Sequence, residues 1–169
     1  MGGQVVRVKV DAGKAAARTG NRAKTWKNMG LRQLRSRAHN AVDCFGNSYG
    51  DVHRFFATNP CRSLNRALFV LSEGSDTIVL SVSWVRMPNA AAAERLQTLA
   101  DRHGTGNVSP IALSLLQVSG VGFTGHNYGS RRLGPLVVIA ETEPVTGSPD
   151  PAFLDGIAEA AALLPPPRR

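Results

Sequence analysis

The sequence lacks any apolar run of about 18 residues, the length that a membrane-spanning helix requires. Its longest candidate, residues 77–85, is too short and is interrupted by serines. The opening residues, Met1-Gly2-Gly3-Gln4-Val5, show no apolar stretch followed by a small-residue cleavage site, so they do not predict a secretory signal. These absences predict a cytoplasmic protein without a transmembrane segment.

Cysteine is also scarce. The sequence has two, Cys44 and Cys61, which are too few for a disulfide scaffold but allow a single bridge. Residues 48–58 between them have a helical pattern and would span about 15 Å, whereas bridged Cα atoms lie within about 7 Å of each other. We therefore favour free thiols over a bridge, which would require the flanking residues to fold back along the helix. A metal site of Cys44, His53 and Cys61 lacks a fourth ligand, so no metal is predicted.

Acidic residues are almost absent from the first forty positions, and lysine is absent from all the others. Residues 1–40 contain ten Lys or Arg and one acid, Asp11, whereas residues 41–169 contain ten Arg and eleven acids. The formal charge of +8 is therefore the sum of +9 and −1. A basic segment joined to a nearly neutral remainder favours the binding of an acidic partner over a general role in solubility.

A length of 169 residues and an apolar share of 43% are typical of one folded domain. No internal repeat or linker divides the chain. We assign residues 1–40 to a basic strand and helix continuous with the domain, residues 41–164 to an α+β body, and residues 165–169 to a Pro/Arg tail.

Periodicity predicts a strand and then a long helix in the basic segment. Residues 5–10 alternate valine with basic residues, the pattern of a half-exposed edge strand that could pair with another chain in a homo-oligomer or a larger assembly. From about residue 21 to residue 42, small and apolar residues recur at helical spacing, with Trp26 on the apolar, core-facing side. Six basic residues fall mostly outside that face, and we expect them to bind polyanions: Arg22, Lys24, Lys27, Arg32, Arg35 and Arg37.

The remaining chain alternates helical and strand patterns. A hairpin joins strands at 67–72 and 77–87, and another strand is expected at 136–142. Helices follow the N-cap residues Asn89 and Asp150. This order predicts a single α+β domain, a mostly antiparallel sheet with helices on one face, for which a ferredoxin-like split βαβ with additions is one candidate topology.

The segment 120–125 has the spacing G-x-G-x-x-G, but the polar residues 126–132 follow it in place of a helix. A dinucleotide-binding fingerprint needs a helix N-terminus to receive the pyrophosphate. We attribute these glycines to bulges or close strand packing and predict no cofactor.

Two histidine-containing segments form another candidate site. His103 begins His-Gly-Thr-Gly-Asn, and His126 begins His-Asn-Tyr-Gly-Ser-Arg-Arg. If the two loops converge, histidine would lie beside hydroxyls and arginine, which serve acid–base chemistry and anion binding. No nucleophile motif or paired-carboxylate spacing accompanies them, so no residue is assigned a catalytic role. The candidates for one are His103, His126 and Tyr128, with Thr105, Asn107, Ser130 and Arg131 expected nearby.

Several of these segments resemble a set of actinobacterial proteins. The resemblance is carried by residues 44–56 (CFGNSYGDVHRFF), Asn59-Pro60-Cys61, residues 103–107 and Phe123-Thr124-Gly125, and would cover roughly residues 42–145. No activity is attached to that set, so the resemblance implies no catalytic residue. It marks the helix between the cysteines and the two glycine loops as segments of interest.

We expect a non-catalytic binding or assembly module whose basic N-terminal helix docks on an acidic partner, either nucleic acid or protein. One alternative is a small enzyme or ligand-binding domain that uses the His103 and His126 loops, and another is a structural subunit of a larger assembly. Acid–base groups must reach one substrate, so histidines more than about 10 Å apart would exclude the enzyme.

Overall fold

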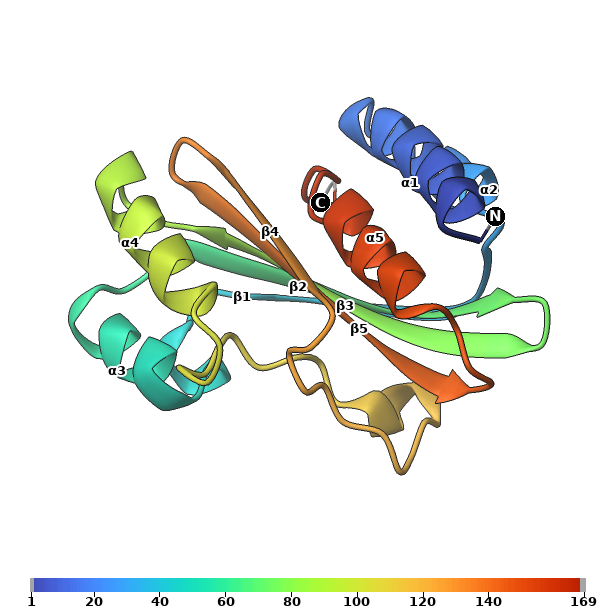
Figure 1. Ribbon diagram of the computed structural model, residues 1–169. Coiled ribbons are helices and arrows are strands. Elements are labelled where there is room, and N and C mark those ends of the chain that lie inside the picture. The colour runs from blue at the N-terminus through green and yellow to red at the C-terminus, as the bar shows by residue number, and fades with distance from the viewer. Residues whose placement is uncertain (1, 168–169) are drawn as a thin grey trace.

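The computed structural model describes residues 2–167, and these residues form one antiparallel sheet with helices packed against it (Figure 1). The strands are β1 (Arg32–Ala41), β2 (Ser63–Glu73), β3 (Asp76–Arg86), β4 (Tyr128–Leu133) and β5 (Leu136–Thr146). The helices are α1 (Gly2–Arg18), α2 (Arg22–Asn28), α3 (Gly50–Thr58), α4 (Ala90–Ala100) and α5 (Pro151–Ala161), with short 3-10 helices η1 (Phe45–Asn47) and η2 (Leu113–Leu116). The predicted α+β class with an antiparallel sheet is confirmed. Arg168 and Arg169, the end of the predicted tail, lie outside the described residues.

The strand order is β1-β2-β3-β5-β4, and every neighbouring pair is antiparallel. This order differs from the ferredoxin-like candidate. In a split βαβ unit the strands that flank a helix are parallel, whereas β1 and β2, which flank α3, are antiparallel neighbours. Tight turns at residues 74–75 and 134–135 join β2 to β3 and β4 to β5, and the first of these is the predicted hairpin.

One face of the sheet packs against α1, α2 and α5. Alternate positions of β2, β3 and β5 supply this core together with the helices, including Phe69, Leu80, Trp84, Val138, Trp26, Phe153 and Ile157. Trp26 is 3% exposed, so its predicted place in the core is observed. Gly156 lets α5 approach α1 closely, because a Cβ at Gly156 would lie 2.3 Å from Val10 Cγ2.

The opposite face is covered by α3, α4 and the segment around η2. The other alternate positions of the same strands pack there, including Leu64, Val137 and Ile139 against α3 and α4, and Leu68 and Val79 beneath the η2 segment. The helices therefore lie on both faces, and the expectation of helices on one face is wrong. Because β2, β3 and β5 carry apolar side chains on both faces, both faces need cover.

Residues 5–10 belong to α1, so the predicted edge strand at this position is wrong. Val6, Val10 and Ala17 also recur at helical spacing, and α1 packs them toward the core, where Val10 and Ala17 are buried. Val5 and Val8 remain exposed. Packing of α1 against α2 and α5 thus overrides the strand preference of the valines.

The predicted long helix is two elements. Helix α2 ends at Asn28, Gly30 adopts a φ of +70°, and the chain enters β1. Left-handed glycines commonly follow helix ends. Strand β1 then pairs with β2 from Arg32 opposite Ser72 to Ala41 opposite Leu64 and satisfies the backbone groups on that side of β2. The basic segment therefore contains a short helix and an edge strand in place of one basic helix.

Two helix starts agree with the sequence. The Asn89 side chain accepts a hydrogen bond from the backbone N–H of Ala92 at 2.8 Å, and the Asp150 side chain accepts one from that of Ala152 at 2.9 Å. Pro151 occupies the first position of α5, where its missing N–H has no cost. Of the helices described, none combines the length and apolar character needed to cross a membrane.

Candidate functional site

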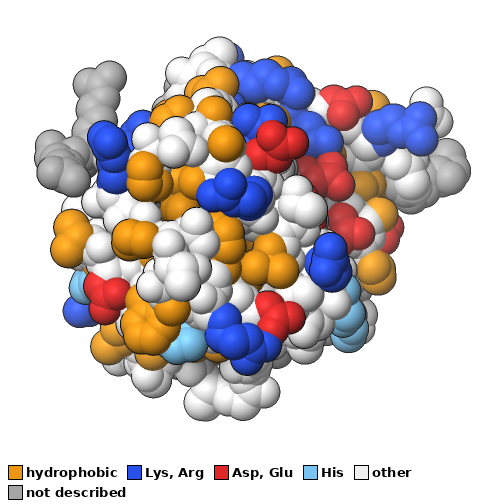
Figure 2. Space-filling view, turned by 90° about the vertical axis from the view of Figure 1, so that its left-hand side faces the viewer, with side chains coloured by type: hydrophobic (Ala, Val, Ile, Leu, Met, Phe, Trp, Pro, Cys, Tyr) orange, Lys and Arg blue, Asp and Glu red, His pale blue; other side chains and the backbone are white. Residues whose placement is uncertain are grey.

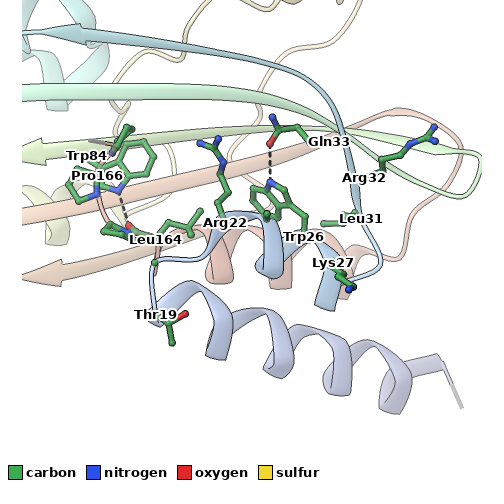
Figure 3. A pocket seen from close by; sticks show the side chains of 14 residues that line it. Thr19, Arg22, Trp26, Lys27, Leu31, Arg32, Gln33, Trp84, Leu164 and Pro166 are labelled. Carbon is green, nitrogen blue, oxygen red and sulfur yellow. Dashed lines mark hydrogen bonds between the residues drawn. The ribbon is translucent and has the colours of Figure 1, made fainter. Parts of the chain in front are cut away.

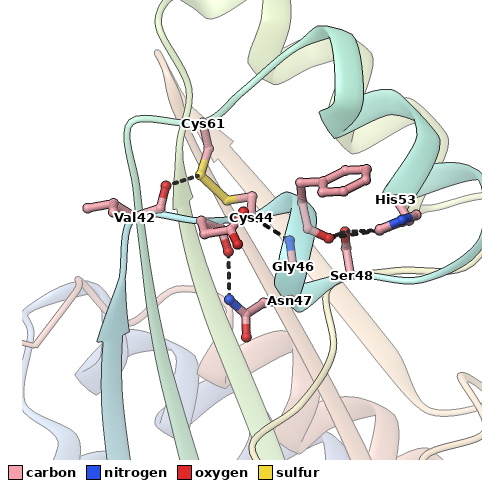
Figure 4. Close-up of a disulfide and its surroundings, with 9 residues drawn as sticks. Val42, Cys44, Gly46, Asn47, Ser48, His53 and Cys61 are labelled. Carbon is pink, nitrogen blue, oxygen red and sulfur yellow. Dashed lines mark hydrogen bonds between the residues drawn. A yellow bond between two sulfur atoms is a disulfide. The ribbon is translucent and has the colours of Figure 1, made fainter.

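Cys44 and Cys61 form a disulfide in the segment that connects β1 to β2 (Figure 4). These strands are antiparallel neighbours, and their pairing reaches Ala41 opposite Leu64, so the chain returns to its starting point after α3. The two Cα atoms are consequently 6.0 Å apart. The expectation of free thiols is wrong, because it considered the length of the helix and not the pairing of the strands on either side of it.

The metal site considered from Cys44, His53 and Cys61 has no free thiolate in this structure. Both sulfur atoms belong to the disulfide, and His53 Nδ1 lies 2.8 Å from the carbonyl oxygen of Phe45 (Figure 4). Among residues 2–167, no group of three or more His, Cys, Asp or Glu side chains is arranged to hold a metal ion. The disulfide therefore has a structural role: it closes the segment from Cys44 to Cys61, which contains η1 and α3.

The loop that begins with His103 is fastened to the start of α3. The backbone N–H of Tyr49 donates to the carbonyl oxygen of Asn107 at 3.0 Å. Gly106 permits this approach: its φ is +84°, and a Cβ there would lie 2.1 Å from the Tyr49 carbonyl oxygen. The disulfide-bridged segment and the His103 loop thus form one packed unit.

His126 lies against His103. Their ring centroids are 5.7 Å apart, and their planes differ by 13°. The segment before His126 is held on β5 by Thr124, whose backbone N–H and hydroxyl both donate to Glu143 Oε1, at 2.9 and 2.5 Å. The two histidine loops therefore converge, within the distance of about 10 Å that a shared ligand site requires.

A cavity of about 530 Å³ lies between these segments. The start of α3, the His103 loop and the segment Phe123-Thr124-Gly125 all contribute to its lining, and Tyr128 of β4 and Glu141 of β5 complete it. The three contributing segments are those marked as of interest in the sequence. The sheet and the loop hydrogen bonds bring them to one place.

Glu141 is the most unusual group that lines the cavity. It is 6% exposed, no hydrogen bond from the described residues contributes to its pKa, and its carboxylate oxygens are not among the fully buried atoms, so they open to the cavity. Burial, reinforced by the negative charge of Glu143, raises the pKa of the Glu141 carboxyl to about 7. Buried carboxyls with raised pKa values are typical of ligand-binding and acid–base sites. Glu141 was not among the residues predicted from the sequence, although an acid within the apolar strand run at 136–142 is a visible signal.

Tyr128 and Ser130 fix Asp101 at the edge of the cavity. The Tyr128 hydroxyl donates to Asp101 Oδ1 at 2.9 Å, and the Ser130 hydroxyl donates to the same oxygen at 2.6 Å. Burial, together with the charge of Asp101 and the hydrogen bond to it, raises the pKa of Tyr128 above its usual range. Burial and the charge of Glu141 likewise raise the pKa of Tyr49. Both hydroxyls are therefore protonated at neutral pH, and that of Tyr128 donates to Asp101.

Only some of the residues expected near His103 and His126 lie there. Thr105 and Asn107 are buried in the His103 loop, and Asn107 lines the cavity. Arg131 turns to the other face of the sheet, where its Nε donates to the carbonyl oxygen of Ala162 at 3.1 Å. Tyr128, Ser130 and Arg131 lie in β4 and not in the expected loop, because the sheet extends to this segment.

The six basic residues expected to bind polyanions do not lie on one helix, so their predicted placement on a single long helix is wrong, while polyanion binding stays a prediction. Three lie in α2 and three in β1, and all are exposed: Arg22, Lys24, Lys27, Arg32, Arg35 and Arg37. Gly30 separates the two groups. In α1, Lys9 pairs with Glu73 and Lys14 pairs with Glu159, so the body neutralises part of the N-terminal charge.

Three of the six, Arg22, Lys27 and Arg32, line a groove of about 900 Å³ beside α2 and β1 (Figure 3). None of the described residues that line it is acidic. Trp26 and Trp84 also lie along the groove, but both are buried and use their indole N–H in hydrogen bonds within the protein. The groove thus offers positive charge and little surface for base stacking.

The side of the molecule that carries α3 and α4 has a different charge distribution. Lys and Arg side chains are interspersed there with Asp and Glu, without a large area of one sign (Figure 2). This agrees with the nearly neutral composition of residues 41–169. The cavity and the basic groove share no lining residue, so they are two distinct candidate sites.

Comparisons with known proteins found no match to any family model, curated protein or solved structure. They provide no family and no activity that could be transferred to this chain.

Proposed function

We propose that the protein is a binding module whose cavity takes a small molecule with an amino group. Glu141 carries this proposal, because it is a buried carboxyl that lines the cavity without a hydrogen-bond donor among the described residues. An ammonium group would supply that donor and a compensating charge. The Glu141 oxygens are not among the fully buried atoms and open to the cavity, where an ammonium group would take the place of water as their partner.

The other residues around the cavity favour the same class of ligand. Two carboxylates line it, Asp101 and Glu141, against one arginine, Arg102. The aromatic lining attracts cationic groups and packs against apolar parts of a ligand; it comprises Tyr49, Phe123 and Tyr128. The volume of about 530 Å³ lies within the usual range of small-molecule sites.

The histidines have a binding role in this proposal. His103 lines the cavity, and the His126 ring stacks against the His103 ring. The sequence has no nucleophile motif to which either imidazole could be matched, so we assign them to ligand recognition in preference to catalysis. The small-enzyme alternative would use the same cavity.

A matched pair of probes tests the proposal. Benzylamine and benzoate share a carbon frame and differ in charge, and their binding can be followed by ligand-observed NMR. We expect benzylamine to bind in preference to benzoate and Glu141→Gln to weaken benzylamine about tenfold or more, because it removes a charge-assisted hydrogen bond. Glu94→Gln is the control, since Glu94 is exposed on α4. Equal binding of both probes, or unchanged binding to Glu141→Gln, would contradict the proposal.

A second binding function, docking of an acidic partner, is favoured by a separate observation. The groove beside α2 and β1 has three cationic side chains and no acid among its described lining residues. A polyanion bound there should dissociate steeply as salt increases. Titration of duplex DNA and of an acidic peptide at low and moderate salt tests this function, and salt-independent binding would exclude it.

The disulfide bears on the cellular location of the protein. The predicted cytoplasmic location stays untested, and the Cys44–Cys61 disulfide argues for an oxidising compartment, since such bonds are rare in the cytosol. Thiol labelling of protein isolated from its native cells would decide between the two. Blocked cysteines on isolation would favour the oxidising compartment, and labelled cysteines would favour the cytosol.

A further inference from the structure

We propose that the outer edge of β1 binds an extended acidic segment of another protein as an additional strand. This inference rests on the second binding function proposed above and specifies its partner and geometry. It concerns a part of the molecule separate from the Glu141 cavity.

Strand β1 is an exposed edge strand that pairs regularly with β2 from Arg35 to Ala41, after a register shift between Gln33 and Arg35. It pairs with β2 on one side only. Residues 32–40 are all exposed, whereas most residues of β2 and β3 are buried. The N–H and C=O groups on its outer side have no strand partner within residues 2–167, and such a row of groups can receive an added strand.

The charge of β1 selects the partner. Arg35 and Arg37 are two residues apart and therefore project from one face of the sheet, beside Val70 and Leu68 of β2. No residue of β1 is acidic. An added strand with acidic residues at alternate positions would place a carboxylate opposite each arginine, and such cross-strand pairs are stabilising.

Other occupants of this edge fit less well. A second copy of the chain paired through β1 would bring its arginines close to those of the first copy, which is destabilising. Nucleic acid would be attracted by the charge but could not continue the backbone ladder of the sheet. Open backbone groups and positive charge occur together on β1, so we favour an acidic polypeptide.

Two peptides of equal charge separate strand addition from simple attraction. One alternates Glu with Thr over about ten residues, and the other alternates Glu with Pro, which lacks the N–H that a ladder requires. We expect the Glu-Thr peptide to bind about tenfold more tightly in fluorescence anisotropy. Hydrogen exchange should show that it protects the backbone amides of residues 32–41. Equal affinities for the two peptides, or tighter binding of duplex DNA, would overturn the inference.

Three double variants with the same change in charge locate the site. Arg35→Glu with Arg37→Glu should weaken the Glu-Thr peptide about tenfold, because two attractive pairs become repulsive. Arg86→Glu with Arg132→Glu, at exposed positions in β3 and β4, should leave it unchanged. Lys24→Glu with Lys27→Glu tests the groove. If only this last variant weakened both peptides, acidic docking would stand and strand addition would be overturned.

Discussion

The Tyr128 hydroxyl donates a 2.9 Å hydrogen bond to Asp101 Oδ1 and thereby joins β4 to the C-terminal end of α4. The same carboxylate oxygen accepts a second hydrogen bond from Ser130. Tyr128 and Asp101 both line the cavity that contains Glu141. The hydrogen bond therefore connects the cavity with the packing of α4 on the sheet.

Tyr128 and Tyr49 are the two tyrosines of the sequence, so their ionisation can be followed without interference. Burial of Tyr128, and partial burial of Tyr49 together with the charge of Glu141, raise the pKa of both above the ordinary value of 10.0. We expect no phenolate transition centred at 10.0 in the absorbance of the native protein, and a transition near that value after unfolding in guanidinium. In Tyr49→Phe, where Tyr128 is the one tyrosine left, the native protein should show no phenolate transition near the ordinary value. Ordinary titration of both groups in the native state would show that their hydroxyls are open to water.

Glu141 should make the protein less stable as the pH rises. Its carboxyl has a pKa of about 7 in the native state against 4.5 for an ordinary glutamate, so the native state binds this proton more tightly. The stabilisation is complete below pH 4.5 and is lost as the pH rises to about 7. The shift corresponds to about 3 kcal/mol of unfolding free energy. Urea unfolding across this range measures it.

Two variants isolate that contribution from other carboxyl groups. Glu141→Gln should lose this part of the pH dependence, whereas Glu94→Gln, on the exposed face of α4, should retain it. If the wild-type protein and Glu141→Gln showed the same pH dependence, Glu141 would not be protonated at neutral pH in the native state.

Removal of the Cys44–Cys61 disulfide should destabilise the protein. The bridge closes a loop with a sequence separation of 17, for which the chain-entropy model gives about 3 kcal/mol. The double variant Cys44→Ser with Cys61→Ser should therefore unfold at lower denaturant, and reductant should affect the wild-type protein but not the variant. Equal unfolding midpoints for the two proteins would show that the bridge adds no stability.

Gly106→Ala should release the His103 loop from α3, and Gly104→Ala is its matched control. Both glycines have positive φ, +84° and +87°, so each substitution introduces strain of about 1–2 kcal/mol. A Cβ at Gly106 would also lie 2.1 Å from the Tyr49 carbonyl oxygen, whereas nothing lies within 4 Å of one at Gly104. Gly106→Ala should thus lose more stability in urea and also lose benzylamine binding. Similar effects of both substitutions would contradict the docking of the loop on α3.

Elements governed by nearby residues could be predicted from the sequence. Asn89 and Asp150 cap helices, and the turn at residues 74–75 joins two apolar strands. In these segments the local preference and the packing favour the same structure. The same agreement explains why the α+β class was accessible from the sequence.

The basic segment could not be predicted in this way, because its structure depends on distant contacts. Residues 5–10 fit both a strand period and a helical period, and in the structure they form a helix that packs against α2 and α5, with Val10 close to Gly156. Residues 32–41 form a strand because β2 pairs with them. The disulfide follows from that same pairing, which the separation of the two cysteines along the sequence does not reveal.

The candidate site was partly accessible from the sequence. The polar loops of His103 and His126 could be expected to converge, and their rings lie 5.7 Å apart. Glu141 was missed because its importance depends on the loops that cover the sheet and leave its carboxylate without a donor. An acid within a buried strand is a signal, but its surroundings determine whether it is paired.

The most direct test of the account is amide NMR mapping of benzylamine binding on the isotope-labelled protein. Binding in the Glu141 cavity should shift the amide signals of residues 103–107, 123–128 and 141, and benzoate at the same concentration should not shift them. Glu141→Gln should abolish these shifts. Benzylamine-induced shifts confined to other parts of the protein, or equal shifts with benzoate, would contradict the proposal that this cavity is a binding site for amines.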